Sequence, residues 1–144
     1  MQKITLAYVV SALGRTGPTQ QLYNLVKYIN HDQFRVELIT LSRNPPRSLE
    51  KEFSNLNVGL HSLNLGRPST MLIGRSRLNA LLRILKPDVI HSQGLRADWL
   101  CATLDHYPIR IATQRNNPFD DYPDLYGKLI GSVAAYLHYR TLRQ

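Results

Sequence analysis

The sequence has few of the residues that build cross-linked or membrane-spanning proteins. Its single cysteine, Cys101, excludes a disulfide within the chain. Because Cys101 follows Ala97 and Leu100 at helical spacing, we expect its thiol to pack in the core. No apolar run reaches the ~18 residues that a membrane-spanning helix requires, and the first apolar run is not followed by a leader cleavage site. These absences favour a cytoplasmic protein.

The motifs of several common enzyme classes are also missing. The chain has no Gly-x-Ser-x-Gly elbow and no cysteine–histidine cluster at metal-ligand spacing. It has neither the dinucleotide fingerprint Gly-x-Gly-x-x-Gly nor a Walker motif ending in Gly-Lys-Ser/Thr. Its aromatic residues are scattered, without a recognised nucleic-acid-binding motif. We therefore predict no metal site and no bound cofactor, and nucleic acid as a partner is supported by charge alone.

Acidic residues are scarce relative to basic ones. The formal net charge is +8, from 18 lysines and arginines against 10 aspartates and glutamates. The stretch 67–86 contains no acid but five basic residues: Arg67, Arg75, Arg77, Arg83 and Lys86. This pattern fits a solvated helix face as well as it fits a functional patch for an anionic ligand or membrane.

Hydrophobic periodicity predicts alternating strands and helices. Apolar and β-branched runs predict strands at 3–10, 34–41, 58–63, 88–92 and 109–113. Helices are expected in each interval, the fourth running from Leu95 to about His106, and a last one over 126–142. Residues 116–123 are expected to form an irregular loop. The apolar face of the last helix, which carries Leu129, Val133, Tyr136 and Leu137, is expected to pack in the core; in a truncated chain, part of it would instead be exposed and favour self-association.

This alternation predicts a fold class and the edge at which a ligand binds. Buried strands separated by helices indicate a Rossmann-like, doubly wound α/β domain over residues 1–144, with helices on both faces of a parallel sheet. Ligands bind such sheets above the carboxyl ends of the strands, where the strand order reverses. That edge would gather the turns at 11–18, 42–47, 92–95 and 114–121.

The first of these turns is a candidate phosphate site, with Gly14, Thr16 and Gly17 as its residues. Pro18 suits the first helical position because it has no N–H to pair, which leaves Gly17 as the N-cap. The unpaired N–H groups of a helix start attract phosphate. A ligand-free explanation is equally good, since glycine also serves tight turns by adopting a positive φ.

The fourth and fifth strands end in two further candidate sites. His91, Gln93 and Gly94 follow the fourth strand, where they would face the crevice, although His91 could simply cap the strand. Arg115 and Asn116 follow the fifth strand. An arginine with amides suits a carboxylate, a phosphate or a sugar hydroxyl, whereas asparagines also stabilise loops without any ligand.

Together these segments resemble the N-terminal domain of a GT-B-fold glycosyltransferase of the group 1 and family 4 type. The Thr16-Gly17 turn and the helix with Asn24-Leu25 are similar to the family's Gly-Gly turn and Asn-Leu helix. Residues 86–94, Lys-Pro-Asp-Val-Ile-His-Ser-Gln-Gly, resemble the family's Lys-Pro-Asp-Val-Val-His-x-His-Gly. The Arg115-Asn116 pair is like one found after the fifth strand in sugar-polymer members.

The resemblance implies roles for individual residues and leaves the catalytic residue unknown. Gly17 matches the glycine that approaches the donor diphosphate, with Thr16 in place of the first glycine. His91 matches the family's first histidine, and Gln93 replaces the second. Arg115 lies near the position where other members place a histidine close to the reacting sugar, which leaves its role open. The implied sites are a donor-phosphate loop of Gly14, Thr16 and Gly17, and an acceptor or sugar site of His91, Gln93, Gly94, Arg115 and Asn116.

The resemblance also implies a function. The chain would be the acceptor-side domain of a retaining enzyme that transfers a sugar from a nucleotide-sugar to a glycan or lipid-linked acceptor, in polysaccharide biosynthesis. The family's donor-binding C-terminal domain is absent from the sequence, so we expect the chain alone to be inactive, as a truncated product or an isolated domain. The basic stretch 67–86 would contact anionic lipid at the inner membrane face. The alternative is a non-catalytic α/β module that binds a phosphorylated ligand or a partner subunit.

Overall fold

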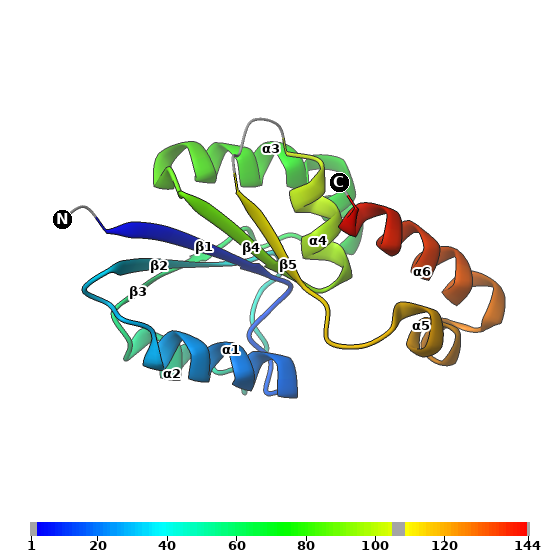
Figure 1. The fold of residues 1–144 in the computed structure, drawn as a ribbon, viewed down its shortest axis with the longest axis horizontal. Coiled ribbons are helices and arrows are strands. Elements are labelled where there is room, and N and C mark those ends of the chain that lie inside the picture. The colour runs from blue at the N-terminus through cyan, green and yellow to red at the C-terminus, as the bar shows by residue number, and fades with distance from the viewer. Residues whose placement is uncertain (1–2, 105–108, 144) are drawn as a thin grey trace.

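A computed structural model describes residues 3–104 and 109–143 of the chain, as a parallel sheet with helices on both faces (Figure 1). The strands are β1 (Ile4–Val10), β2 (Phe34–Thr40), β3 (Val58–Ser62), β4 (Val89–Gln93) and β5 (Arg110–Thr113). The helices are α1 (Gly17–Tyr28), α2 (Glu50–Ser54), α3 (Arg67–Leu85), α4 (Leu95–Ala102), α5 (Pro118–Tyr126) and α6 (Lys128–Leu142). The predicted Rossmann-like α/β class is confirmed.

The strand order places a topological switch point between two central strands. The sheet runs β3-β2-β1-β4-β5, and every pairing is parallel. The chain first builds outward from β1 to β3 and then returns to β4 on the other side of β1. The register aligns the strand ends, since Val10 pairs with Gln93 and Gln93 with Thr113. The carboxyl ends of β1, β4 and β5 therefore meet at one level, where such sheets bind ligands.

Alternate residues of β1 point to two separate cores. Ala7 and Val9 pack on one face with apolar residues of α3 and α4. Tyr8 and Val10 pack on the other face with apolar residues of α1 and with Phe53 of α2. Figure 1 shows the same division, with α1 and α2 on one side of the sheet and α3 and α4 on the other. The near-continuous apolar sequence of β1 is thus explained by burial on both faces.

Several local predictions are refined or confirmed. Cys101 is 3% exposed, and burial raises the pKa of its thiol to about 12, which confirms packing rather than reactivity. The N-cap of α1 is Thr16, not Gly17, so Pro18 is the second helical residue. Helix α4 ends at Ala102, and the expected helix end near His106 lies outside the described residues.

The expected loop over 116–123 is wrong, because helix α5 begins at Pro118. Asn117 is its N-cap, and the Asn117 side-chain oxygen accepts a hydrogen bond from the backbone N–H of Phe119 at 3.1 Å. An asparagine before a proline is typical of turns, but the same pair also starts helices. Gly127, with a φ of 82°, then separates α5 from α6.

The expected burial of the apolar face of α6 is also wrong. Leu129 is 82% exposed, and Val133, Tyr136 and Leu137 are each more than half exposed. The buried residues of α6 are instead Gly131, Ala135 and His138, through which it packs on α5 and α4. Helices α5 and α6 form a pair at one side of the sheet (Figure 1). Periodicity thus located an apolar stripe but not the side of the helix that the fold covers.

Candidate functional site

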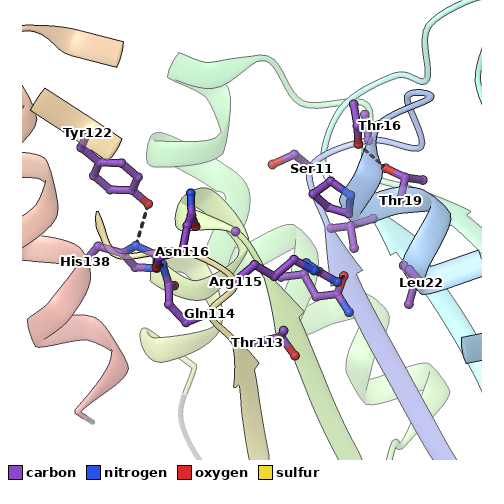
Figure 2. A pocket seen from close by; sticks show the side chains of 15 residues that line it. Ser11, Thr16, Thr19, Leu22, Thr113, Gln114, Arg115, Asn116, Tyr122 and His138 are labelled. Atoms are coloured by element: carbon purple, nitrogen blue, oxygen red, sulfur yellow. Dashed lines mark hydrogen bonds between the residues drawn. The ribbon is translucent and has the colours of Figure 1, made fainter. Parts of the chain in front are cut away.

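A cavity of about 240 Å³ opens at the carboxyl ends of β1, β4 and β5. Figure 2 shows Tyr122 and His138 at one side of it, Ser11, Thr16 and Thr19 at the other, and Arg115 between them. The cavity is lined by Val10, Ser11, Ala12, Thr16, Pro18, Thr19, Leu22, Gln93, Gly94, Thr113, Gln114, Arg115, Asn116, Tyr122 and His138. Four segments distant in the sequence, within 10–22, 93–94, 113–122 and at 138, thus contribute to one site at the switch point.

Five of the eight residues proposed from sequence for the donor-phosphate and sugar sites line this cavity: Thr16, Gln93, Gly94, Arg115 and Asn116. Gly14, Gly17 and His91 do not line it. Gly14 instead forms an antiparallel bridge with Ser48, in the loop before α2. A Cβ added at Gly17 would meet nothing within 4 Å, so the space beside the start of α1 is open.

The positive φ expected for the glycines of the first turn is not found, although Gly14 has a structural role in its bridge with Ser48. Within the described ranges, the glycines with positive φ are Gly94 and Gly127, and neither Gly14 nor Gly17 is among them. Thr16 has an extended backbone, and its side chain does not cap the helix. Its hydroxyl instead lies 3.0 Å from the hydroxyl of Thr19. The start of α1 therefore presents two hydroxyl groups to the cavity.

Arg115 is held in place by two neutral amides from opposite sides of the site. Its Nε donates to Oε1 of Gln21 on α1 at 2.7 Å, and its Nη2 donates to Oε1 of Gln93 on β4 at 3.0 Å. The loop that carries Arg115 is itself fixed, because the Gln114 side chain donates to the Asn116 carbonyl at 2.8 Å. Asn116 in turn donates to the carboxylate of Asp121 on α5. The guanidinium position is thus set by four segments of the fold.

His91 lies beside the cavity as a neutral, half-buried group. Its Nε2 is 2.6 Å from Oγ1 of Thr113, and its ring centroid is 4.9 Å from that of Tyr8. Burial lowers the pKa of His91, and the nearby positive charge of Arg115 lowers it further. A neutral imidazole at pH 7 can orient the Thr113 hydroxyl, but it adds no positive charge for a phosphate.

A buried polar chain forms the far wall of the cavity. The Tyr122 hydroxyl lies 2.7 Å from Nδ1 of His138, and Nε2 of His138 lies 2.9 Å from Oδ2 of Asp98. The side chains of His138 and Asp98 are each 1% exposed. Burial, with smaller effects from Tyr126 and then Asp98, raises the pKa of Tyr122 to about 12. The tyrosine therefore stays protonated and acts as a hydrogen-bonding group rather than a nucleophile.

Sequence reasoning missed both this chain and Gln21. His138 lies 40 residues from Asp98, so nothing in the local sequence links the two. Gln21 is an exposed polar residue on a surface helix, which is the commonest context for a glutamine. The one sequence feature that could have indicated the buried chain is His138 itself, a polar residue beside the apolar stripe of the last helix.

The predicted basic patch lies along α3, apart from the cavity. All five of its residues are exposed, and none lines the cavity. Helix α3 covers the face of the sheet opposite to α1 (Figure 1). Met71 is 72% and Leu72 is 84% exposed on the same helix, so the surface is apolar as well as basic. None of the helices in the described ranges combines the length and apolar character needed to cross a membrane.

The fold and the site define a class of protein: a parallel α/β domain with a small cavity at its switch point, in which polar groups lie among apolar ones. The sequence model of glycosyltransferase family 4 matches residues 15–144, and the chain belongs to that family. The resemblance found in three sequence segments is thereby confirmed. A glycosyltransferase-type function follows, with a sugar donor and an acceptor as its general substrates. A search of curated proteins found no match.

Proposed function

We propose that this chain is the acceptor-side domain of a retaining glycosyltransferase that acts in polysaccharide biosynthesis. It would help transfer a sugar from a nucleotide-sugar to a glycan or lipid-linked acceptor. The observation that carries the proposal is the cavity lining, in which hydroxyl, amide and guanidinium groups converge at the switch point. These groups hydrogen-bond well to sugar hydroxyls and phosphates. No further cofactor is required by the proposal.

The two sides of the cavity would take different parts of the substrates. On the α1 side, the donor phosphates would bind the hydroxyls of Thr16 and Thr19 inside the cavity and extend into the open space beside Gly17, which does not line the cavity itself. On the other side, Gln93, Arg115 and Asn116 would hold the acceptor or the transferred sugar. His91 would act from beneath, by orienting Thr113.

The proposal includes a second, donor-binding domain as a requirement for transfer. Among the described residues that line the cavity, none carries a carboxylate, and the buried Tyr122 stays protonated. The one imidazole of the described lining, that of His138, has both ring nitrogens hydrogen-bonded, to Tyr122 and Asp98, so neither is free to exchange a proton with a substrate. Transfer also requires groups on both sides of the reacting carbon. We therefore predict that the 144-residue chain alone binds substrate but forms no product.

The experiment is a titration of the ¹⁵N-labelled chain followed by amide chemical shifts. Suitable probes are UDP-glucose, GDP-mannose and methyl α-glucoside. We expect shifts confined to residues 16–19, 93–94 and 113–116. Shifts elsewhere, or none with any sugar, would contradict the proposal. Binding of phosphorylated compounds irrespective of any sugar would favour the alternative, a non-catalytic module that binds a phosphorylated ligand or a partner subunit. Product formed by the pure chain would disprove the need for a donor-binding domain.

For location, the proposal is a cytoplasmic domain that contacts the inner face of the membrane through α3. The exposed Met71 and Leu72 lie on the same helix as its four exposed arginines, a combination that suits anionic lipid. We expect binding to vesicles with phosphatidylglycerol that falls as salt rises, and no binding to phosphatidylcholine alone. The double variant Arg77→Glu, Leu72→Gln should abolish binding. The control Arg47→Glu, in the loop before α2, should not. Equal binding to both vesicle types would contradict the proposal.

A further inference from the structure

We propose that the sugar held in this cavity carries an anionic group, a carboxylate or a phosphate, which binds the guanidinium of Arg115. The inference rests on the proposed function, which it deepens by naming a class of substrate. It separates acidic sugars from neutral ones, a distinction that family membership by itself does not make.

The first observation is that no carboxylate neutralises Arg115. Within the described part of the chain Arg115 forms no ion pair, which is also true of exposed arginines such as Arg47 and Arg77, but it differs from those two in being fixed by two hydrogen bonds. Both of its described hydrogen bonds go to neutral glutamine oxygens. An arginine that only served to fasten the loop would gain more from a carboxylate, because such charge-assisted pairs are stronger. The positive charge is thus positioned without being cancelled.

The second observation is that the guanidinium has donors left over. Arginine has five N–H groups in a planar fork, and the two glutamines accept from one N–H of Nε and one of Nη2. The described residues provide no hydrogen-bond partner for the remaining N–H groups. A carboxylate or phosphate accepts two parallel N–H groups from such a fork. Because the glutamines already fix the arginine, little side-chain entropy would be lost when an anion binds.

The third observation is the electrostatic setting of Arg115. The described cavity lining contains no acid; the nearest carboxylates, those of Asp121 and Asp98, lie behind Asn116 and His138 and already accept hydrogen bonds from them. The charge of Arg115 is felt inside the site, since it contributes to the lowered pKa of His91. The formal net charge of the chain, +8, adds attraction at longer range. An anion at this position would therefore gain from both the local and the overall field.

The rest of the lining suits a sugar ring rather than a bare ion. The amide of Asn116 and the hydroxyls of Thr113, Thr16 and Ser11 also line the cavity and can bond to ring hydroxyls. At about 240 Å³, the cavity is smaller than the roughly 300–1,000 Å³ of typical ligand pockets. A cavity of that size takes about one sugar residue with one charged substituent, so the remainder of a larger substrate would extend beyond it.

The test compares acidic and neutral sugars on the whole chain by calorimetry. The probes are glucuronate, glucose 6-phosphate, glucose and inorganic phosphate. We expect one or both acidic sugars to bind at least about tenfold more tightly than glucose. Preference for glucuronate would identify the anion as a carboxylate, and preference for glucose 6-phosphate would identify it as a phosphate. Arg115→Gln should remove the preference, and Arg115→Lys should retain part of it. The matched control Arg47→Gln, in the loop before α2, should leave it unchanged.

A second readout does not depend on affinity alone. An anion bound to Arg115 should raise the pKa of His91, followed by NMR, because it cancels the charge that lowers it. Arg115→Gln should raise the same pKa without ligand and should then make it insensitive to ligand. Thermal unfolding of Arg115→Gln serves to show that the variant remains folded.

The outcomes separate this inference from the proposed function. If glucose binds as tightly as both acidic sugars and Arg115→Gln has no effect, the anionic substrate is disproved while the glycosyltransferase domain stands. If inorganic phosphate binds as tightly as glucose 6-phosphate and glucuronate does not bind, the sugar contributes nothing and the inference also fails. If no sugar binds in the cavity, both the inference and the proposed function fail.

Discussion

Gln21 and Arg115 are 94 residues apart in the sequence, yet the Arg115 Nε donates to the Gln21 Oε1 at 2.7 Å. The contact joins the first helix to the loop after the last strand, across the switch point between β1 and β4. It works with the bond from Arg115 to Gln93 to hold a cationic group over the cavity. Two neutral side chains thus position the group on which the substrate proposal depends.

Loss of the Gln21 amide should weaken ligand binding without destabilising the fold. In Gln21→Ala, Arg115 keeps only its bond to Gln93, so we expect the preferred acidic sugar to bind about three- to tenfold less tightly. Because Gln21 is exposed, the free energy of unfolding should change by less than about 0.5 kcal/mol. Calorimetry and urea unfolding measure the two effects. The neighbouring Gln20→Ala, which removes a bond to Asn24, is the control, and an equal loss of affinity there would contradict the prediction.

A methyl group at Gly17 should separate stability from donor binding. A Cβ there meets nothing within 4 Å, so Gly17→Ala should leave the fold intact and stabilise it by about 0.4–1 kcal/mol through the unfolded state. The same methyl group would occupy the open space into which we propose the donor phosphates enter. UDP-glucose should therefore bind more weakly, as seen by titration. Unchanged binding, with the expected gain in stability, would remove Gly17 from the donor-phosphate loop.

A methyl group at Gly131 should instead push α5 away from α6. Its Cβ would lie 2.2 Å from the carbonyl oxygen of Tyr122 and 2.4 Å from the nitrogen of Pro123, and backbone atoms cannot rotate aside. Gly131→Ala should lower the free energy of unfolding by about 1–3 kcal/mol, despite the better helix propensity of alanine. Urea unfolding measures this. The control Val133→Ala, at a position 54% exposed on the same helix, should change stability by less than about 0.5 kcal/mol.

The buried pair of Asp98 and His138 should respond non-additively to substitution. His138→Leu leaves the Asp98 carboxylate buried without its partner, which should cost about 3–5 kcal/mol of stability. Oδ1 of Asp98 already has no described partner, so no second bond can compensate. The double variant Asp98→Leu, His138→Leu removes both groups and should recover most of that loss.

Tyr122→Phe calibrates the same experiment, since it removes one hydrogen bond and should cost only about 0.5–1.5 kcal/mol. Denaturant unfolding at pH 7 of the wild-type chain, His138→Leu, the double variant and Tyr122→Phe gives the comparison. If the double variant is less stable than His138→Leu, Asp98 stabilises the fold even without His138, and the prediction is wrong.

His91 should make stability depend on pH in the mildly acidic range. Burial and the charge of Arg115 lower its pKa in the folded state below the ordinary value of about 6.5. Between the two pKa values, His91 is therefore protonated in the unfolded chain but neutral in the folded chain, which favours unfolding. This contribution is fully present above about pH 6.5 and is lost as the pH falls through the folded-state pKa. Unfolding measured from pH 7.5 to 5 should show it.

Two variants isolate the contribution of His91 to that profile. His91→Gln should flatten the part of the profile that begins near pH 6.5, because the titrating group is gone. Arg115→Gln should make the loss of stability at acidic pH smaller. Without the charge of Arg115, the pKa of His91 in the folded state lies closer to its pKa in the unfolded state. Profiles of the three proteins that superimpose would show that His91 is not the group responsible.

The sequence was sufficient for the parallel sheet and for the edge at which the structure has its candidate cavity. The apolar run of β1 and the alternation that follows it determine a parallel sheet, because strands buried on both faces must be covered by crossover helices. Once the sheet is parallel, the ends of β1, β4 and β5 must meet at one edge. Gln93 and Arg115 could therefore be assigned to one site before their contact was known.

Local sequence signals failed where one pattern serves two structures. Asn117-Pro118 marks a turn, but it also caps a helix, and only the packing of α5 on α6 selects the helix. The apolar stripe of α6 was identified from its spacing, yet the fold buries Gly131, Ala135 and His138 instead. Periodicity records which side chains are apolar. It does not record which side of a helix a neighbouring element covers.

The sequence by itself determined the parallel α/β class and the edge at which chemistry-bearing residues gather, because both follow from the alternation of short hydrophobic patterns, whereas the strand order came from the tertiary structure. Only the tertiary structure decided which groups touch: the fastening of Arg115 by Gln21 and Gln93, and the buried chain from Asp98 through His138 to Tyr122. These hydrogen bonds require atoms to come within about 3 Å, yet the residues that form them are up to 94 positions apart in the sequence. A local sequence pattern cannot predict a contact between residues so far apart.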